Sequence, residues 1–306
     1  MKKRPIIIDT DPGIDDAVAI AIALFDETLD VRLLTTVSGN VSVDKVTDNL
    51  LRLLKFWGKS VRVAKGAQKP LIQIREDAAS VHGSSGMDGY EFPAVTYENL
   101  IEEHAVVALR NELLQSKEKI TLVPIGPLTN IALLLSTYPE VKEKIEEIIL
   151  MGGSAGRGNY GVLSEFNIGF DPEAAKIVFE SGLKITMAGL DVGLKALVYH
   201  EDSLEIKAQN KTGEMIYALF QKYRGGSLKT GLKMYDSTAI AYLLNKDLFE
   251  TVYTHVSIET EGTYTKGATL VDLKGYLKKE PNVTVCLDIK QEEFSVWLKE
   301  ALAKCI

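Results

Sequence analysis

The chain has little of what several protein classes require. It holds only two cysteines among 306 residues, Cys286 and Cys305, and no CxxC spacing. This excludes a disulfide framework and a zinc–thiolate site. No apolar run is long enough to span a bilayer, and the apolar stretch after the basic N-terminus ends at Asp9, too early for a signal peptide. We therefore expect a cytoplasmic protein that does not enter a membrane.

The chain also lacks an excess of positive charge, because 42 acidic residues outnumber 35 basic ones. The formal net charge is −7, and Lys and Arg form no block, which argues against nucleic acid or an anionic membrane surface as a partner. A Walker-type phosphate loop is also missing. The 46% of apolar residues can form one large α/β core. The composition therefore indicates an ordinary globular protein for which polyanions are unlikely partners.

Short β-branched segments alternate with helical ones, which predicts a mainly parallel α/β sheet. The continuous apolar run Ile6-Ile7-Ile8 is typical of a strand covered by helices on both faces. We predict strands at 5–9, 31–37, 61–64, 119–125, 148–151, 184–190 and 283–289. We predict helices at 14–25, 42–57, 99–114, 172–180, 237–244 and through Phe294 and Trp297, with short strands around Gly262, Gly267 and Gly275.

Two segments stand out as functional loops. Residues 72–93 contain three closely spaced glycines and little periodicity, which is typical of a long functional loop and not of a domain boundary. Residues 217–233 contain Gly225-Gly226 and several lysines, and we predict that they form a mobile lid.

The strongest chemical signal is the acidic turn after the first strand. Asp9, Asp11, Asp15 and Asp16 fall within eight residues at a strand's carboxyl end, where α/β proteins bind ligands. One or two of these acids could merely cap a helix or complement its dipole. Four mutually repelling carboxylates instead favour a bound cation. No His or Cys is near, so the ion is hard, and the missing phosphate loop favours Ca²⁺ over Mg²⁺.

The string DTDPGIDDA at 9–17 strongly resembles the N-terminal signature of the inosine-uridine type nucleoside hydrolases. Further similar blocks follow in family order, namely VSGN at 37–40, PIGPLTN at 124–130, MGG at 151–153, EFN at 165–167 and DPEAA at 171–175. The resemblance implies a single Rossmann-like domain over residues 1–306, bound Ca²⁺, and hydrolysis of the N-ribosidic bond of ribonucleosides by a metal-bound water. It also implies a homodimer or homotetramer and a role in nucleoside catabolism and purine and pyrimidine salvage.

The same resemblance implies the site residues. Asp11, Asp16 and Asp236 would bind calcium through carboxylates, and Ile125 through its backbone carbonyl. Asp11 would also accept the proton of the attacking water, while Asn159 and Glu165 would orient the sugar and support its developing charge. Five polar residues would form hydrogen bonds with the ribose hydroxyls, namely Asp15, Asn40, Asn159, Glu165 and Asn167. Taken alone, Asn40 could cap the helix that begins near Ser42, and Glu165 and Asn167 could be exposed loop residues.

The residues expected to contact the leaving base depart from the family pattern. Many relatives have a His before the last calcium Asp, whereas this chain has Tyr235, and a phenol with an unperturbed pKa of about 10 is a weaker acid than His. His82 matches a family loop position near the base and is the remaining acid candidate, with an exposed loop histidine as the alternative. Phe166 and Tyr223 are predicted to line the base pocket.

Two rival functions remain open at this point. Asp9-Thr10-Asp11 satisfies the short Asp-x-Asp pattern of haloacid dehalogenase-like phosphatases, although the residues that follow do not continue it. A non-catalytic calcium-dependent ribose or nucleoside binder needs most of the same groups, and the Tyr235 substitution leans towards it. The sequence does not identify the preferred base.

Overall fold

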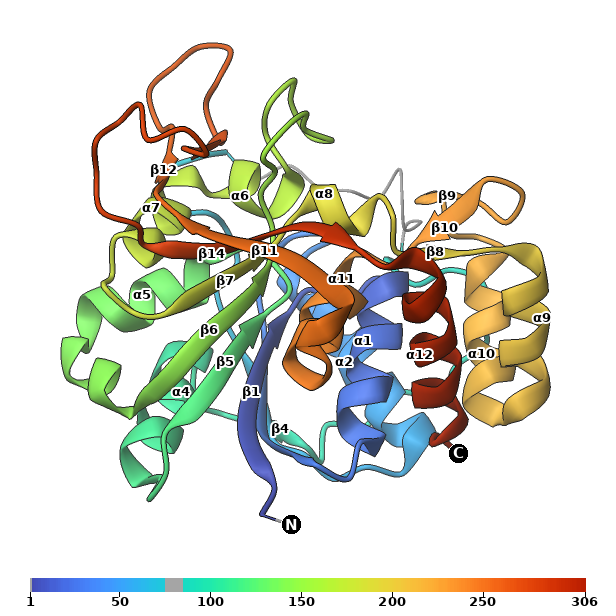
Figure 1. Cartoon of the computed structure of the whole chain (residues 1–306). Coiled ribbons are helices and arrows are strands. Elements are labelled where there is room, and N and C mark those ends of the chain that lie inside the picture. Colours follow the sequence, from blue (N-terminus) through green and yellow to red (C-terminus); the bar gives the residue numbers. More distant parts are fainter. Residues whose placement is uncertain (1, 75–84) are drawn as a thin grey trace.

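A nine-stranded sheet forms the centre of the computed structural model, which describes residues 2–74 and 85–306 (Figure 1). The strand order is β11-β14-β7-β6-β5-β1-β2-β3-β4, and every neighbouring pair is parallel except β11 with β14. The strands are β1 (Arg4–Thr10), β2 (Leu29–Thr36), β3 (Val63–Lys65), β4 (Leu100–Ile101), β5 (Ile120–Pro124), β6 (Ile145–Met151), β7 (Ile185–Ala188), β11 (Phe249–Thr254) and β14 (Val283–Ile289). The predicted open, mainly parallel α/β sheet is confirmed.

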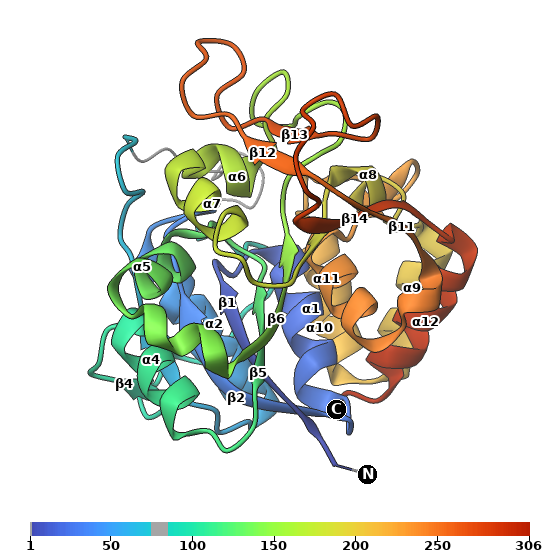
Figure 2. The ribbon, with the colours of Figure 1, turned by 60° about the vertical axis from the view of Figure 1, so that its left-hand side comes forward.

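Helices cover both faces of this sheet (Figure 2). One layer contains α1 (Ile14–Phe25), α2 (Val43–Trp57), α10 (Lys211–Phe220), α11 (Tyr235–Leu244) and α12 (Gln291–Ala303), and the other contains α4 (Ala105–Gln115), α5 (Thr129–Thr137) and α7 (Pro172–Phe179). Ile6 and Ile8 of β1 pack into the first layer and Ile7 into the second. Each of these fully buried side chains contributes roughly 1.5–3 kcal/mol of burial free energy, so the apolar run holds both layers.

Local signals fix the ends of the two helices nearest the first strand. Helix α1 begins at Ile14 as predicted, and the Asp16 carboxylate accepts a hydrogen bond from the Gly13 backbone N–H at 2.8 Å. Helix α2 ends at Gly58, whose φ of 61° lies in the left-handed region, where glycine pays no steric penalty. Ser42 is the residue that precedes α2. These boundaries place Asp15 and Asp16, the last two acids of the acidic turn, in the first turn of a helix.

The helix predicted at 99–114 begins later than expected. Leu100 and Ile101 form the short strand β4 beside β3, and α4 starts only at Ala105. His104 caps α4, because its Nδ1 accepts a hydrogen bond from the Val106 backbone N–H at 3.3 Å. Pairing with β3 thus competes successfully with the local helical pattern, and His104 has a structural role.

The structure contains several short elements that periodicity did not reveal, most of them after β7. The strand predicted at 184–190 stops at Ala188, and α8 (Leu190–Gly193) follows at once. The remaining short elements are α6 (Phe166–Phe170), α9 (His200–Gln209), β8 (Leu197–Val198), β9 (Gly226–Ser227), β10 (Gly231–Lys233), β12 (Val256–Ile258), β13 (Thr269–Val271) and two 3₁₀ helices at Pro139–Lys144 and Lys246–Leu248. The predicted lid segment thus comprises the end of α10 and the strands β9 and β10, and its mobility stays a prediction.

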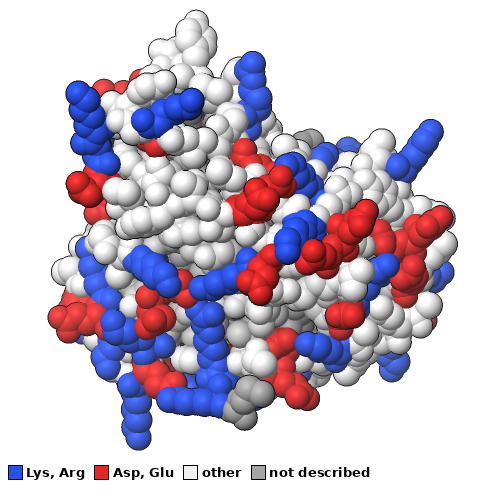
Figure 3. All heavy atoms as spheres, in the orientation of Figure 1, with Lys and Arg blue, Asp and Glu red and all other residues white. Residues whose placement is uncertain are grey.

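The surface carries charges of both signs. Acidic and basic side chains stand next to one another over most of the face in Figure 3, and ion pairs such as Lys195 with Asp288 at 2.7 Å lie on the surface. Within the described ranges, no helix combines the length and the apolar character that crossing a bilayer requires.

Candidate functional site

An acidic cluster lies where β1 ends and α1 and α11 begin. Asp15 and Asp16 come from the first turn of α1, and Asp236 comes from the first turn of α11, which packs against α1. Each contributes one carboxylate oxygen to a group whose members all lie within 4.8 Å of one another, and all three residues are buried. The cluster could hold a metal ion through oxygen atoms alone.

The predicted metal ligands Asp16 and Asp236 therefore meet in the structure, and Asp15, predicted to bind ribose, joins them. Asp11 lies at the edge of this group, and its charge interacts with those of Asp15 and Asp16. Two glycines enclose the Asp11 carboxylate: a Cβ on Gly39 would lie 2.1 Å from Oδ2, and one on Gly126 would lie 2.5 Å from Oδ1. Side chains at these two positions would displace Asp11, so the sequence keeps both positions free of Cβ atoms.

Asn40 connects Asp11 to Asp16. The Asn40 backbone N–H donates to Asp11 Oδ2 at 2.7 Å, and its side-chain amide donates to the Asp11 carbonyl at 3.0 Å and to Asp16 Oδ2 at 3.4 Å. Asp16 also accepts from the Thr10 hydroxyl at 2.6 Å. The alternative in which Asn40 caps α2 is wrong, since Ser42 occupies the capping position. Asn40 instead orders the carboxylates.

The carboxylates of this cluster are costly to ionise together. Burial raises the pKa of Asp15 to about 7, and the negative charge of Asp16 adds to the effect. Burial and then the charge of Asp16 raise the pKa of Asp11 well above its usual value, and burial and then the charge of Asp15 do the same for Asp236. A divalent cation placed among them would reverse these shifts, because it favours the charged form of every neighbour.

Asn167 positions the carbonyl that was predicted to bind metal. Its side-chain amide donates to the Ile125 carbonyl at 2.9 Å and to the Met151 carbonyl at 3.1 Å. A carbonyl oxygen has two lone pairs, so the Ile125 oxygen keeps one for another ligand. Asn167 is 5% exposed, and the alternative of an exposed loop residue is wrong.

Glu165 is also buried, with 2% of its surface exposed. It caps α6: Oε1 accepts from the Asn167 N–H at 3.0 Å, and Oε2 accepts from the N–H groups of Gly153 at 2.9 Å and Ile168 at 3.2 Å. Burial raises its pKa to about 7, although these backbone hydrogen bonds oppose the shift. The Glu165 carboxyl group is therefore held in one position, either charged or protonated. The alternative of a loop residue exposed at the surface is wrong.

The other two predicted residues of this block lie nearer the surface. Asn159 is exposed, and its Oδ1 accepts a hydrogen bond from the Phe166 N–H at 2.9 Å. The Phe166 ring packs between Tyr160 and Phe170, with ring centroids 5.6 Å and 5.8 Å away. Asn159 is thereby tied to α6, the helix that carries Asn167.

Two tyrosines approach the acidic cluster from the lid segment and α11. Tyr223 is 5% exposed and donates its hydroxyl to the Lys233 carbonyl at 3.0 Å. Burial and the charge of Asp15 raise its pKa well above 10. Tyr235 is half-buried, and burial followed by the charges of Asp15 and Glu165 raises its pKa as well. Both phenols therefore keep their protons, and both lie near Asp15.

His82, the candidate acid for the leaving base, lies outside the described residues. Two other histidines make structural contacts away from the acidic cluster: His104 caps α4, and the His255 ring lies 2.8 Å from the Glu280 carbonyl and 2.9 Å from the Ser257 hydroxyl.

A second row of polar residues lies behind the site, and of its members the sequence analysis singled out only Asp9. Asp9 Oδ1 accepts hydrogen bonds from the Thr35 hydroxyl and from the Asn130 amide, the latter at 2.8 Å. Asn130 also accepts from the Ala67 N–H at 2.9 Å and donates to the Thr36 carbonyl at 3.0 Å. This network joins the ends of β1, β2 and β3 to α5. The only signal for it was the presence of Asn130 in the block at 124–130.

Comparison with known proteins gives one consistent result. The sequence model of the family described as inosine-uridine preferring nucleoside hydrolase matches residues 6–296. The non-specific ribonucleoside hydrolase RihC of Klebsiella pneumoniae is 52% identical over 98% of this chain and 99% of its own, and that of Escherichia coli is 50% identical over the same shares. Among solved structures, a purine-preferring ribonucleoside hydrolase from Gardnerella vaginalis superposes with a TM-score of 0.90 at 28% identity, covering 98% of both chains. A plant nucleoside hydrolase gives 0.89 at 30% identity, covering 98% of this chain and 99% of its own.

Proposed function

Because this chain belongs to the inosine-uridine preferring nucleoside hydrolase family and is a ribonucleoside hydrolase that cleaves the N-glycosidic bond, we propose that it does so with Ca²⁺ held by its acidic cluster. The observation that carries this proposal is the convergence of buried oxygens from Asp15, Asp16 and Asp236. The phosphatase and the non-catalytic binder considered from the sequence alone are wrong for a member of this family.

The donor set fits a hard divalent cation. Its members are oxygens from the cluster, the Asp11 carboxylate and the Ile125 carbonyl, with no nitrogen or sulfur ligand among them. Calcium accepts six to eight oxygens, including carbonyls and substrate hydroxyls. Burial raises the pKa of all four acids in this set above the usual value, which disfavours their charged forms unless a cation is present. When bound, calcium would supply the positive charge that keeps these carboxylates ionised and aligns sugar hydroxyls with a water molecule.

We propose that the polar residues around the cluster bind ribose. Asn40 and Asn167 keep their side chains among the buried carboxylates and carbonyls of the site, and Asp15 and Glu165 offer acceptors to sugar hydroxyls. Asn159, held through the Phe166 backbone, would contact the sugar from the surface side. Paired acceptors of this kind discriminate ribose from deoxyribose, because an absent hydroxyl leaves buried polar groups unpaired.

The reaction needs charge stabilisation more than covalent chemistry. Breaking the ribosidic bond places positive charge on the sugar ring, which an anionic pocket stabilises more in the transition state than in the ground state. We propose that Asp11 accepts a proton from the attacking water, since Asn40 and the two glycines leave its carboxylate one orientation. Glu165, fixed by three backbone N–H groups, would support the charge on the ring.

At the base end, we propose that Tyr235 faces the leaving base. Its raised pKa keeps the hydroxyl protonated, so it can donate a hydrogen bond to the departing base but is a poor proton donor. Phe166 and Tyr223 would offer ring surfaces. The RihC relatives are named non-specific ribonucleoside hydrolases, and a pocket that donates one hydrogen bond and otherwise stacks would accept both purine and pyrimidine nucleosides.

The decisive experiment removes and restores the metal. Purified protein treated with a calcium chelator is incubated with inosine, uridine, cytidine and adenosine, and free base is measured by chromatography. We expect no release of base in chelator and recovery on adding Ca²⁺. Recovery with Mg²⁺ alone, or activity that survives complete chelation, would exclude the calcium proposal while leaving the hydrolase activity in place.

We further propose that the active species is a homodimer or homotetramer in the cytoplasm and serves purine and pyrimidine salvage, as the family resemblance implies. Light scattering on the eluting peak of a sizing column would measure the assembly, and a monomer at working concentration would exclude it.

A further inference from the structure

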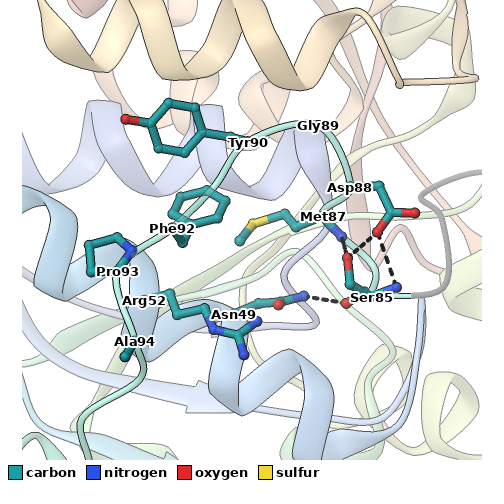
Figure 4. Close-up of a pocket in the computed structure, with 10 residues that line it drawn as sticks. All are labelled: Asn49, Arg52, Ser85, Met87, Asp88, Gly89, Tyr90, Phe92, Pro93 and Ala94. Atoms are coloured by element: carbon teal, nitrogen blue, oxygen red, sulfur yellow. Dashed lines mark hydrogen bonds between the residues drawn. The ribbon is translucent and has the colours of Figure 1, made fainter.

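Asn49 joins two parts of the chain from a buried position on α2. Its side chain is 1% exposed, and its amide nitrogen donates one hydrogen bond to the Pro12 carbonyl at 3.2 Å and another to the Ser85 carbonyl at 2.8 Å. Pro12 belongs to the acidic turn, and Ser85 lies in the segment that Figure 4 shows passing over α2. A side-chain amide has two N–H groups, so both bonds form at once.

The two groups that Asn49 binds, the acidic turn and the Ser85 carbonyl, differ in how many other hydrogen bonds hold them in place. The acidic turn is fixed independently by hydrogen bonds from Gly13 and Thr10 to Asp16 and from Asn40 to Asp11. For the Ser85 carbonyl, the bond from Asn49 is the one that the structure gives over the part of the chain it describes. Loss of Asn49 should therefore release Ser85 more than the turn.

Packing fixes the residues after Ser85 but leaves Ser85 itself against open space. Met87 is 3% exposed in the core, and Gly89 lies so close to α10 that a Cβ would be 2.8 Å from the Ala218 carbonyl. On the other side, a cavity of about 430 Å³ is lined by Asn49, Arg52, Ser85 and the chain from Met87 to Ala94 (Figure 4). Ser85 is tied to this packed stretch as well, because its backbone N–H donates to Asp88 Oδ1 at 3.3 Å and its hydroxyl accepts from the Met87 N–H at 3.2 Å (Figure 4). The amide of Asn49 then joins this stretch to the acidic turn.

The segment 85–89 also lies beside the part of the site that contains Asn40. Gly86 has a φ of 84°, and a Cβ there would lie 2.9 Å from Val41, the residue after Asn40. From there the segment reaches α10, whose end leads to Tyr223. It therefore runs from the Asn40 side of the site towards the Tyr223 side.

We propose that Asn49 is a positioning residue for nucleoside binding: its amide ties Ser85 to the acidic turn and so sets the spacing between the turn and the segment 85–89. The inference rests on the proposed function of the site, since the segment borders the ribose and base groups named there. In this proposal Asn49 acts through the backbone carbonyls of Ser85 and Pro12.

The test uses Asn49→Leu, which has nearly the same size and shape but no donor. We expect KM for uridine and inosine to rise about tenfold, with kcat and calcium affinity changed by less than about threefold, because the turn keeps its other hydrogen bonds. Calcium affinity is measured by titration calorimetry on the chelated protein. If Asn49→Leu is insoluble, the smaller polar change Asn49→Ser replaces it with the same expectation.

Thr47→Val is the matched control on the same helix. The Thr47 hydroxyl is buried, donates to the Val43 carbonyl at 2.6 Å and lies 2.7 Å from the Thr36 hydroxyl, so its loss perturbs α2 without touching the turn or Ser85. We expect a lower melting temperature but an unchanged KM.

Three outcomes would overturn the proposal: an unchanged KM in Asn49→Leu, an equal rise in Thr47→Val, or a collapse of kcat together with calcium affinity. A wild-type protein that releases no base would instead contradict the proposed function itself, so the two failures are distinguishable.

Discussion

Asn40 binds both the side chain and the backbone of Asp11: its backbone N–H donates to the Asp11 carboxylate at 2.7 Å, and its side chain donates to the Asp11 backbone carbonyl at 3.0 Å. The side chain also reaches Asp16 at 3.4 Å. One residue of the loop after β2 thus holds Asp11 in the loop after β1 and Asp16 in the first turn of α1. The loop after β2 therefore determines the orientation of groups that belong to another part of the chain.

Asn40→Ala should keep the backbone bond to Asp11 and lose both side-chain bonds. We expect kcat/KM for uridine to fall about 10- to 100-fold, because a buried hydrogen bond to a charged group contributes roughly 1.5–3 kcal/mol. Steady-state kinetics measure this. Ser42→Ala is the control: Ser42 precedes α2 and makes no side-chain capping bond, so its kinetics should match the wild type. Equal losses in the two variants would contradict the role given to Asn40.

Asp11→Asn keeps the shape of the side chain and removes its ability to accept a proton. We expect the fold to persist and turnover to fall by roughly 10²- to 10⁴-fold, the usual contribution of a general base. Circular dichroism and kcat for inosine are the two measurements, and Asp11→Ala should give the same result. Asp9→Asn, which changes a buried acid of the second row, should lose far less. Near-normal kcat in Asp11→Asn would exclude Asp11 as the base.

The metal-free protein should become less stable as the pH rises. Burial raises the pKa of Asp15 and of Glu165 to about 7 in the folded chain, whereas both titrate near 4 when unfolded. The folded state therefore binds more protons between about pH 4 and 7, and this stabilisation disappears as the pH passes through 7. In chelator, we expect the melting temperature to fall from pH 5.5 to pH 8, and added Ca²⁺ should remove the decline. A melting temperature that rises with pH in chelator would contradict the assignment.

Gly193→Ala should disturb Tyr235 from outside the site. A Cβ at Gly193 would lie 2.4 Å from the Tyr235 ring, so the ring must shift. We expect kcat/KM to fall roughly tenfold, because small misplacements of groups near the reacting bond are costly. Gly156→Ala, whose nearest neighbour is 3.8 Å away, should have no such effect. In a Tyr235→Ala background, Gly193→Ala should cost little more, and additive losses would show that the glycine acts elsewhere.

The sequence predicted the elements whose signals are local. The run Ile6-Ile7-Ile8 specifies β1 because both faces of the strand are buried, and Asp16 and Gly58 mark helix ends through bonds to nearby backbone. Helix α6 was missed because its five residues are too few to show a period. Glu165 therefore looked like a loop residue, although it caps that helix.

Long-range contacts were accessible only through resemblance. Nothing in the local pattern links Asp236 to Asp16, because the packing of α11 on α1 brings them together. Asn130 and Asn49 were missed for the same reason: nothing in the local sequence marks either residue, and the hydrogen-bond partners of each lie elsewhere in the chain. Their importance appears only when those partners are known.

The position of Asp236 also sets an order of events during synthesis. Asp15 and Asp16 leave the ribosome early, but α11 follows nearly the whole sheet. A partly made chain presents only part of the cluster and cannot enclose a cation. Capture of the ion therefore comes late in biogenesis and marks a chain whose sheet and both helical layers are largely assembled.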